Sequence, residues 1–270
     1  MASIQGSECL MRKIVAVIQA RVGSKRLPRK VLLDLEDRTV LEHVIYRVKN
    51  SKLISDSIVA TTILKEDLEI MKLCSSNNIR VYCGSENDVL DRYYQAARLL
   101  EADDVVRITA DCPLIDTKVI DRVLKLHLFK KTDYTSNAVK ETFPDGEDVE
   151  VFTFKTLQKA WKDARMLSER EHVTSYMKKH PELFKIANLK NTKNLSEKRW
   201  TLDEREDYKF IKLVYEKLYK KNKLFGMEEI IRLLNEHPEY EKINNKIRRN
   251  EGYLKSLKKD KTWVSHKIYI

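Results

Sequence analysis

The stretch Lys13–Lys30, with the sequence KIVAVIQARVGSKRLPRK, joins two patterns that together decide the fold. Its first seven residues, Lys13–Gln19, are almost all apolar, which is typical of a β-strand buried on both faces of a parallel sheet. The residues that follow are mostly polar and cationic, and they include Gly23. The stretch therefore predicts a buried strand that ends in a basic loop.

Strand and helix patterns alternate through the first half of the chain. Short apolar runs predict further strands at Ser57–Thr62, Ile79–Cys83 and Asp104–Thr109. Helical spacing of apolar residues predicts helices at Val40–Val48, Glu66–Asn77, Asp88–Leu100 and Lys118–Phe129. Four strand–helix units in a row indicate an α/β fold, an open and mostly parallel sheet with helices on both faces.

The pattern changes after Tyr134. The turn Pro144–Gly146 precedes a short predicted strand, and three helices and two strand-like segments follow; in chain order these elements are Asp148–Phe152, Lys155–Arg165, Ser168–Lys179, Leu183–Leu189, Arg199–Leu202 and Arg205–Tyr219. Helical patterning continues to about Tyr253. We expect one domain over residues 12–222, a basic helical C-terminal cap over residues 223–270, and a flexible extension at residues 1–11.

The composition places the chain among globular proteins. Of its 270 residues, 42% are hydrophobic and 34% are charged, which argues against a disordered or collagen-like chain. No stretch approaches the ~20 consecutive apolar residues of a membrane span, and the N-terminal residues lack the apolar run of a signal peptide. We therefore expect a cytoplasmic protein without membrane insertion. The four cysteines form no CxxC pair, so we expect them to be reduced and mostly buried.

The net charge of +11 is concentrated at the C-terminal end. Residues 211–270 contain 15 Lys and Arg and 8 Asp and Glu, which gives this segment a net charge of +7. A basic segment can bind nucleic acid. Here, however, the charges alternate with apolar residues at helical spacing, as on the solvated faces of terminal helices. Nucleic-acid binding is therefore not the function that we expect.

The basic loop after the first predicted strand is the first candidate site. It contains five cations within ten residues, together with Gly23 and Ser24. In an open α/β sheet, ligands bind beyond the carboxyl ends of the strands, and such a loop can surround a polyphosphate with backbone N–H groups and positive charge. The loop contains neither GxxxxGK[ST] nor GxGxxG. A solvated basic loop is the alternative.

A second candidate site follows the strand Asp104–Thr109. Asp111 lies just beyond this strand and before Pro113. A carboxylate there can hold Mg²⁺ against phosphates, because Mg²⁺ prefers oxygen ligands and takes only one or two from protein. Taken alone, a helix cap is as good an explanation of Asp111, although Asp116 is better placed for that role because it directly precedes the next predicted helix.

Together these segments resemble a known family. The pattern IQARxGSxRLPxKxL, which covers Ile18–Leu32, resembles the nucleotide-binding signature of the sugar-acid cytidylyltransferases, such as the Kdo and acylneuraminate cytidylyltransferases. Further matches are similar to the branch of the spore-coat polysaccharide biosynthesis protein F; they are Gly84–Tyr93, Arg107–Asp116, Pro144–Gly146 with Asp148–Phe152, Arg170–Thr174, and Arg199–Asp203 with Asp207. The resemblance implies a Rossmann-like nucleotidyltransferase fold, similar to the GT-A fold.

The resemblance also implies roles for individual residues. The implied nucleotide-binding residues lie in the basic loop and at three positions further along the chain. They are Ala20, Arg21, Gly23, Ser24, Lys25, Arg26 and Lys30, then Ser85, Asp88 and Arg92. Asp111 and Asp203 match the family's two metal-binding carboxylates, and Mg²⁺ is the implied cofactor. The catalytic set is therefore Arg21, Lys30, Asp111 and Asp203. Asp203 has an alternative role as the cap of the helix that starts near Glu204.

Three residues are candidates for the acceptor pocket. Asp148 and Glu150 alternate with valines, so both carboxylates lie on one face of a short strand, which either lines the pocket or faces solvent. His172 is a candidate for a substrate contact or for a structural hydrogen bond. The other histidines form no evident cluster in the sequence, so metal binding through them is not expected.

The implied reaction is attack by a small acidic, sugar-like acceptor on the α-phosphate of CTP with release of pyrophosphate, for surface polysaccharide or glycoconjugate synthesis. The sequence leaves GTP and UTP open as nucleotides. It also leaves open a glycosyltransferase that uses a nucleotide-sugar donor, although such an enzyme has little use for a cationic triphosphate loop, and the chain has no DxD motif at Asp111. Relatives of this type are often dimers, so a homodimer is a further expectation.

Overall fold

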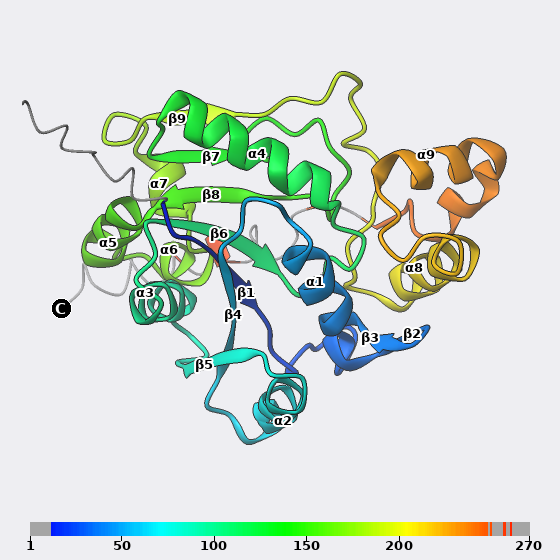
Figure 1. Ribbon diagram of the computed structural model, residues 1–270, viewed down its shortest axis with the longest axis horizontal. Coiled ribbons are helices and arrows are strands. Elements are labelled where there is room, and N and C mark those ends of the chain that lie inside the picture. The colour runs from blue at the N-terminus through cyan, green and yellow to red at the C-terminus, as the bar shows by residue number, and fades with distance from the viewer. Residues whose placement is uncertain (1–11, 248, 250–255, 258–259, 261–270) are drawn as a thin grey trace, which may run out of the picture.

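A seven-stranded sheet forms the centre of the protein (Figure 1). The structure is a computed structural model, which describes residues 12–247, 249, 256–257 and 260. The strand order is β5-β4-β1-β6-β8-β7-β9. The bounds of these strands are, in chain order, Ile14–Gln19 (β1), Asp56–Thr62 (β4), Arg80–Gly84 (β5), Asp104–Thr109 (β6), Tyr134–Ser136 (β7), Glu150–Thr153 (β8) and Ile186–Asn188 (β9). A two-stranded ribbon pairs β2 (Asp34–Leu35) with β3 (Arg38–Thr39).

Six strands of this sheet share one direction, and β8 runs against them. Strands β5, β4, β1 and β6 pair in parallel, as the alternation in the first half of the chain predicts. Strand β8 is antiparallel to both β6 and β7, and β9 is parallel to β7. The mostly parallel sheet is therefore confirmed. The carboxyl ends of β1 and β6 lie side by side, because Gln19 pairs with Thr109.

Helices cover both faces of the sheet, as predicted. Their bounds are Val40–Lys49 (α1), Leu68–Ser76 (α2), Val89–Leu99 (α3), Thr117–Lys130 (α4), Phe154–Asp163 (α5), Leu167–Glu171 (α6), Ser175–Lys179 (α7), Arg205–Leu218 (α8) and Met227–Glu236 (α9), with short 3-10 turns at Lys30–Leu32 (η1), Lys65–Asp67 (η2) and Pro238–Ile243 (η3). One apolar core joins the sheet to α1, α2, α4, α8 and α9, and a second joins the other face to α3 and α5.

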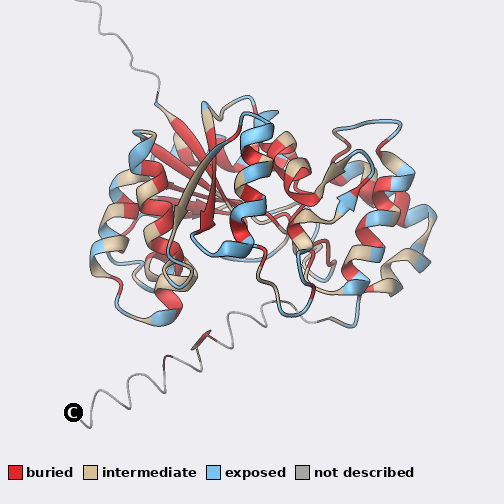
Figure 2. Cartoon of the chain, turned by 90° about the horizontal axis from the view of Figure 1, so that it is seen from below, coloured by how far each residue is buried: buried red, intermediate tan, exposed pale blue. Residues whose placement is uncertain are grey.

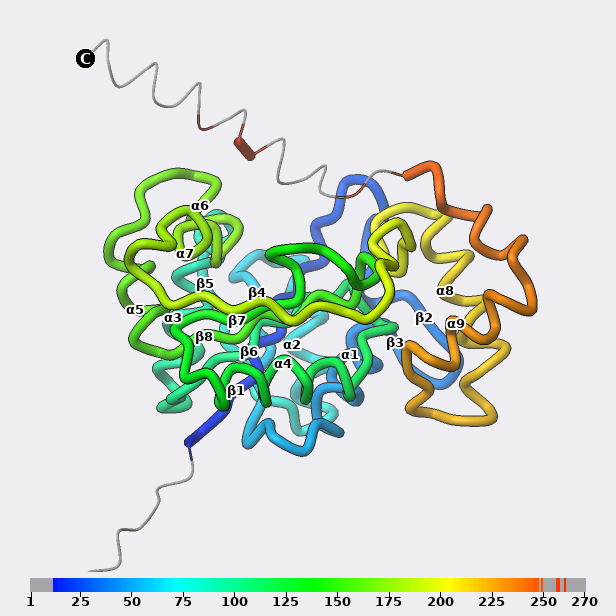
Figure 3. Tube along the Cα trace, turned by 90° about the horizontal axis from the view of Figure 1, so that it is seen from above, coloured from blue at the N-terminus to red at the C-terminus, as the bar shows by residue number. Residues whose placement is uncertain are grey.

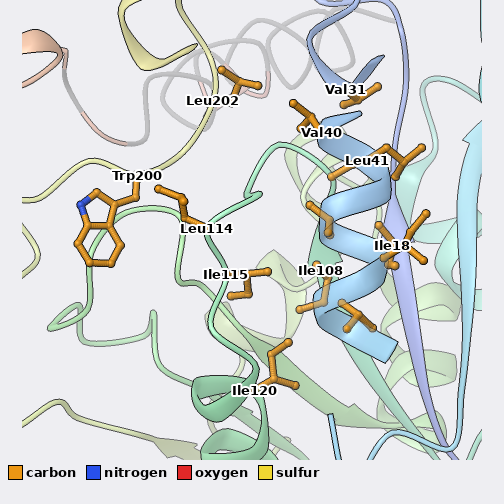
Figure 4. Close-up of a cluster of buried hydrophobic side chains, with 14 of the residues drawn as sticks. Ile18, Val31, Val40, Leu41, Ile108, Leu114, Ile115, Ile120, Trp200 and Leu202 are labelled. Atoms are coloured by element: carbon orange, nitrogen blue, oxygen red, sulfur yellow. The ribbon is translucent and has the colours of Figure 1, made fainter. Parts of the chain in front are cut away.

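Burial follows the sequence patterns (Figure 2). In β1 every residue from Ile14 to Ile18 is buried, because the strand has helices on both faces. Figure 4 shows the core beneath the carboxyl ends of β1 and β6, where Ile18 and Ile108 pack near α1, and Leu114, Trp200 and Leu202 bring the later chain into the same cluster. This packing makes a rigid floor below the loops that follow the strands.

The second half of the chain departs from the predicted elements at two places. The predicted helix Ser168–Lys179 is divided into α6 and α7, because Val173 has a left-handed backbone with φ of 49° and turns the chain between them. The predicted strand Arg199–Leu202 forms an isolated bridge between Asp145 and Arg199, because single backbone hydrogen bonds to Asp111 and Asp145 hold the segment instead of a strand ladder. Strand β7 and the β2–β3 ribbon were not predicted.

The C-terminal helices lie at one end of the molecule and α5–α7 at the other end (Figure 3). Helix α9 and η3 agree with the predicted cap, and the apolar side chains of α8 and α9 belong to the same core as the sheet. The boundary at residue 222 stays a prediction, and residues 1–11 lie outside the described residues. Among the described helices, none has the length and apolar character needed to span a membrane.

Candidate active site at the carboxyl ends of β1 and β6

A cleft of about 840 Å³ opens where β1 and β6 end. Its walls come from the basic loop, the segment after β6, the turn before β8, the break between α6 and α7, and the segment before α8. Twelve of the fifteen residues predicted from the sequence line it, namely Ala20, Arg21, Gly23, Ser24, Lys25, Arg26, Lys30, Asp111, Asp148, Glu150, His172 and Asp203. Segments that are distant in sequence therefore meet in one cleft.

A buried carboxylate fixes the basic loop to the sheet. The side chain of Asp67 accepts a hydrogen bond from the backbone N–H of Val22 at 2.6 Å and a second from the hydroxyl of Thr62. Within the loop, the N–H of Leu27 donates to the Ser24 hydroxyl at 3.4 Å. The loop is thus a defined turn that presents four of its five cations to the cleft, which supports binding over the solvated alternative. The sequence analysis missed Asp67, whose only signal is an acid near the start of a helix.

Lys30 lies between the two predicted metal ligands. Its Nζ is 2.7 Å from Asp111 Oδ2 and 2.7 Å from Asp203 Oδ1. Burial alone would lower the pKa of Lys30, but the two carboxylates outweigh it and raise that pKa. Burial likewise opposes ionisation of Asp111, yet the Lys30 ammonium lowers the pKa of Asp111 to about 2. Lys30 and Asp111 are therefore both charged at neutral pH.

The segment Arg199–Asp203 brings Asp203 to this position. The N–H of Leu202 donates to the carbonyl oxygen of Asp111 at 2.8 Å, and the N–H of Trp200 donates to that of Asp145 at 2.7 Å. Gly146 makes the second contact possible, because a Cβ there would lie 2.7 Å from backbone atoms of Trp200 and Thr201, and its φ of 112° suits glycine.

Asp203 is not the cap of α8. Glu204 occupies the N-cap position, and Asp207 accepts the N–H groups of Asp203 and Glu204, each at 2.9 Å. The carboxylate of Asp203 instead faces Lys30, Arg26 at 3.0 Å and Arg199 at 3.5 Å. By contrast Asp116 is the N-cap of α4 and accepts from the N–H of Lys118, as predicted.

The two carboxylates are a suitable donor set for a hard divalent cation. Asp111 and Asp203 already converge on one cationic atom, so their oxygens can share an ion. Among the described residues no group of three or more His, Cys, Asp or Glu side chains is arranged to hold a metal. Mg²⁺ is commonly held in this incomplete way, by one or two carboxylates completed by substrate phosphates and water.

Glu150 organises the other end of the cleft. This residue is 3% exposed, and its carboxylate accepts from the hydroxyl of Tyr134 at 2.5 Å and that of Thr174 at 2.7 Å. It also forms ion pairs with Arg107 and with Lys178, the latter at 2.9 Å. Burial opposes its ionisation, but Lys178 and Arg107 lower the pKa of Glu150 below its usual range. The carboxylate therefore positions two cations that line the cleft.

Two further acids, Asp145 and Asp148, line the same cleft. Asp148 is paired with Arg249 at 2.8 Å, and burial raises the pKa of Asp148. Burial also raises the pKa of Asp145 to about 7, although Arg249 and Arg199 oppose the shift. Arg199 joins Asp145 at 3.1 Å to Asp207 at 2.9 Å, and so ties this wall of the cleft to the start of α8.

His172 lines the cleft and also takes part in a structural contact. Its Nε2 lies 2.9 Å from the hydroxyl of Ser256. Burial lowers the pKa of His172 to about 4, although the nearby Glu171 opposes the shift. The imidazole is therefore neutral at physiological pH.

Three predicted nucleotide contacts lie outside the lining of the cleft. The Asp88 side chain caps α3 and pairs with Arg170, and the Ser85 hydroxyl accepts the N–H of Asp88 at 3.3 Å. Arg92 is 1% exposed and donates to the carbonyl oxygen of Ala60 at 3.3 Å, because its helix packs on the sheet. Their contacts in this structure are with other parts of the protein, and their role in nucleotide binding stays a prediction.

Sequence reasoning also missed residues that do line the cleft. Glu86 pairs with Arg21 at 3.1 Å, and Arg107 and Lys178 face the opposite end. A charged residue inside the apolar strand DVVRIT was the available signal for Arg107. Lys178 had no such signal, because its position depends on the turn at Val173.

Comparisons with known proteins agree with this geometry. The family model described as "Cytidylyltransferase" matches residues 15–251. An uncharacterized protein of Methanocaldococcus jannaschii is 43% identical over 87% of this chain and 96% of its own length. The spore coat polysaccharide biosynthesis protein SpsF of Bacillus subtilis is 32% identical over 85% of this chain and 97% of its own.

A solved structure gives the same result. The chain superimposes on a cytidylyltransferase from Leptospira borgpetersenii with a TM-score of 0.81 and 34% identity, over 85% of this chain and 96% of that one. The resemblance inferred from the basic loop is thus confirmed, and so is the nucleotidyltransferase fold. The chain belongs to the cytidylyltransferase family and is a nucleotidyltransferase.

Proposed function

We propose that this enzyme transfers the cytidylyl group of CTP to a small acidic, sugar-like acceptor used for surface polysaccharide or glycoconjugate synthesis. The observation that carries the proposal is the cluster of Lys30, Asp111 and Asp203 beside a loop of further cations, inside one cleft. The family assignment supports CTP, and it favours nucleotidyl transfer over glycosyl transfer.

The basic loop would bind the triphosphate. Arg21, Lys25 and Arg26 line the cleft with Lys30, and each can donate charge-assisted hydrogen bonds to phosphate oxygens. The same contacts stabilise the charge that develops on pyrophosphate as it leaves. The loop therefore serves both binding and the chemical step.

Asp111 and Asp203 would hold Mg²⁺ at the α-phosphate. When bound, this ion neutralises phosphate charge and polarises the phosphorus that is attacked. The two carboxylates fix its place relative to the loop, because one follows β6 and the other is hydrogen-bonded to the same segment through Leu202.

The acceptor would bind at the end of the cleft organised by Glu150. Arg107 and Lys178 supply positive charge for its acidic group, and Glu150 keeps both side chains in place. An acceptor oxygen then forms a bond to the α-phosphorus while the bond between that phosphorus and the bridging oxygen of pyrophosphate breaks, and pyrophosphate leaves with the electron pair of that bond. When the acceptor oxygen is a hydroxyl, its proton is released to solvent. Alignment of these groups in the cleft supplies most of the catalysis that the protein must provide.

Pyrophosphate release tests the function. The enzyme is incubated with Mg²⁺, each nucleoside triphosphate in turn, and a panel of sugar acids that includes Kdo and N-acetylneuraminate. The expected result is pyrophosphate release that requires both CTP and one class of acidic acceptor. Release with GTP or UTP alone among the nucleotides would overturn the choice of CTP. Nucleoside diphosphate release from nucleotide-sugar donors would favour glycosyl transfer.

A further inference from the structure

Lys30 occupies the place where a divalent cation would bind. Its ammonium is 2.7 Å from an oxygen of Asp111 and 2.7 Å from an oxygen of Asp203. The lysine side chain is only 12% exposed, so it is enclosed by the cleft wall. An ammonium and a divalent ion repel each other strongly at such short range, so they cannot both lie between the same two carboxylates.

We propose that Lys30 is an exchangeable internal cation, which makes metal binding depend on the nucleotide. Without nucleotide, its ammonium keeps the two carboxylates together. When the triphosphate enters, the ammonium moves to phosphate oxygens and leaves the carboxylates to the metal ion. The proposal rests on the metal site and on the nucleotide of the proposed function.

The charges explain the coupling. A metal ion that binds alone must displace Lys30, whose ammonium then stays in the cleft without its two partners, and an unpaired charge in such a place is costly. A bound triphosphate removes this cost because it offers the ammonium new anionic partners. Nucleotide therefore raises the affinity for metal, and by linkage metal raises the affinity for nucleotide.

The local structure permits the exchange. Lys30 is the first residue of η1, and the next residue, Val31, is 2% exposed and fixes the backbone in the core. The side chain has a four-carbon stem with freely rotating bonds, so its ammonium can move while the backbone stays in place. Arg21, Lys25 and Arg26 line the same cleft and would draw the triphosphate toward it.

Metal binding to the nucleotide-free protein is the test. Free Mn²⁺ is measured by electron paramagnetic resonance during titration of the wild type, Lys30→Met and Lys25→Met. Lys25 lies in the same loop and lines the same cleft, so its substitution removes one positive charge of the loop without touching the carboxylate pair. We expect Lys30→Met to bind Mn²⁺ about tenfold more tightly than the wild type, or more, and Lys25→Met to change little.

Two further measurements test whether the gain in metal affinity comes from an ion bound between the two carboxylates. The double variant Lys30→Met with Asp111→Asn should lose the gain, which places the ion between the carboxylates. Mg²⁺ alone should raise the melting temperature of Lys30→Met by more than that of the wild type. Circular dichroism checks that each variant is folded, and Lys30→Gln replaces Lys30→Met if the latter is not.

The outcomes separate this inference from the proposed function. Equal Mn²⁺ affinities of wild type and Lys30→Met, or an equal gain in Lys25→Met, would overturn the exchange even in an enzyme that uses CTP. A tighter Lys30→Met site in a protein that releases no pyrophosphate would support the exchange of cations and contradict the proposed reaction.

Discussion

The backbone N–H of Leu202 donates a hydrogen bond to the carbonyl oxygen of Asp111 over 2.8 Å. Asp203 is the next residue, so this bond places its carboxylate beside that of Asp111, although the two acids belong to opposite halves of the chain. The pair is therefore set by main-chain geometry as well as by the charge of Lys30.

Asp203→Asn is expected to lower turnover by about 100-fold or more at limiting Mg²⁺. The substitution removes a negative charge from the proposed metal site and keeps the shape of the side chain. Because Glu204 and not Asp203 occupies the N-cap position of α8, and Asp207 accepts the N–H groups of both, the melting temperature should change little. Pyrophosphate release and thermal unfolding provide the two measurements, and a fully active variant would exclude a metal role for Asp203.

Arg21→Ala should weaken CTP binding by roughly 1.5–3 kcal/mol, the usual loss for a hydrogen bond to a charged group. Arg29→Asn is the matched control, because Arg29 belongs to the same loop but pairs with Glu69, at 2.5 Å, outside the cleft lining. Asparagine also tolerates the left-handed backbone of Arg29, where φ is 61°. Isothermal titration calorimetry should show a loss of CTP affinity for Arg21→Ala and not for Arg29→Asn. Equal losses in the two variants would mean that Arg21 acts only through the long-range effect of its charge.

Lys178→Met should raise the KM for the acceptor about tenfold, because it removes one of the cations that Glu150 positions. The KM for CTP should stay the same. Lys179→Met removes the neighbouring charge, which pairs with Glu169 at 3.3 Å and does not line the cleft. Steady-state kinetics with each substrate varied in turn checks this, and a rise in the KM for CTP instead would place Lys178 in the nucleotide site.

The contribution of His172 to the stability of the protein should be lost as the pH drops from about 6.5 toward 4. Burial lowers the pKa of His172 to about 4, against 6.5 for the free side chain. Between these values the unfolded chain binds a proton that the folded protein does not, so the free energy of unfolding falls by at most about 1.4 kcal/mol per pH unit. His172→Gln should show a shallower slope in urea unfolding over this range. Parallel slopes would show that His172 is not the group responsible.

Gly146→Ala should destabilise the protein by roughly 1–3 kcal/mol and reduce turnover. The new methyl group would lie 2.7 Å from backbone atoms of Trp200 and Thr201, and these atoms cannot move without shifting Asp203. Gly23→Ala is a useful comparison, since its methyl group meets only the flexible end of Glu66. In thermal unfolding, the melting temperature of Gly146→Ala should therefore be well below that of Gly23→Ala.

The first half of the fold could be predicted because each element has a local pattern of its own. The apolar run at Lys13–Gln19 and the helical spacing at Val40–Val48 correspond closely to β1 and α1. The basic loop was found for the same reason, since its cations and glycine are contiguous in sequence. Its anchor Asp67 was not found, because that contact joins different elements.

The rest depends on tertiary contacts that local patterns do not encode. The segment Arg199–Leu202 has the composition of a strand, yet hydrogen bonds to Asp111 and Asp145 hold it as an isolated bridge. The left-handed turn at Val173 interrupts an otherwise regular helical pattern. Motif matches nevertheless brought Asp203 and Glu150 into the candidate site, because such matches carry information about distant contacts.

In chain order, the reversed strand β8 lies between the parallel strand β1, which precedes the basic loop, and the later segments that line the other end of the cleft. The loop proposed for the nucleotide follows β1, whereas β8, α7 and the turn between α6 and α7, together with Arg107 of β6, line the end proposed for the acceptor. A new acceptor can therefore be accommodated by altering residues from β8 to α7 while β1 and its loop are kept. Exchange of the segment from β8 to α7 between related enzymes is therefore a direct way to change which acceptor the enzyme uses.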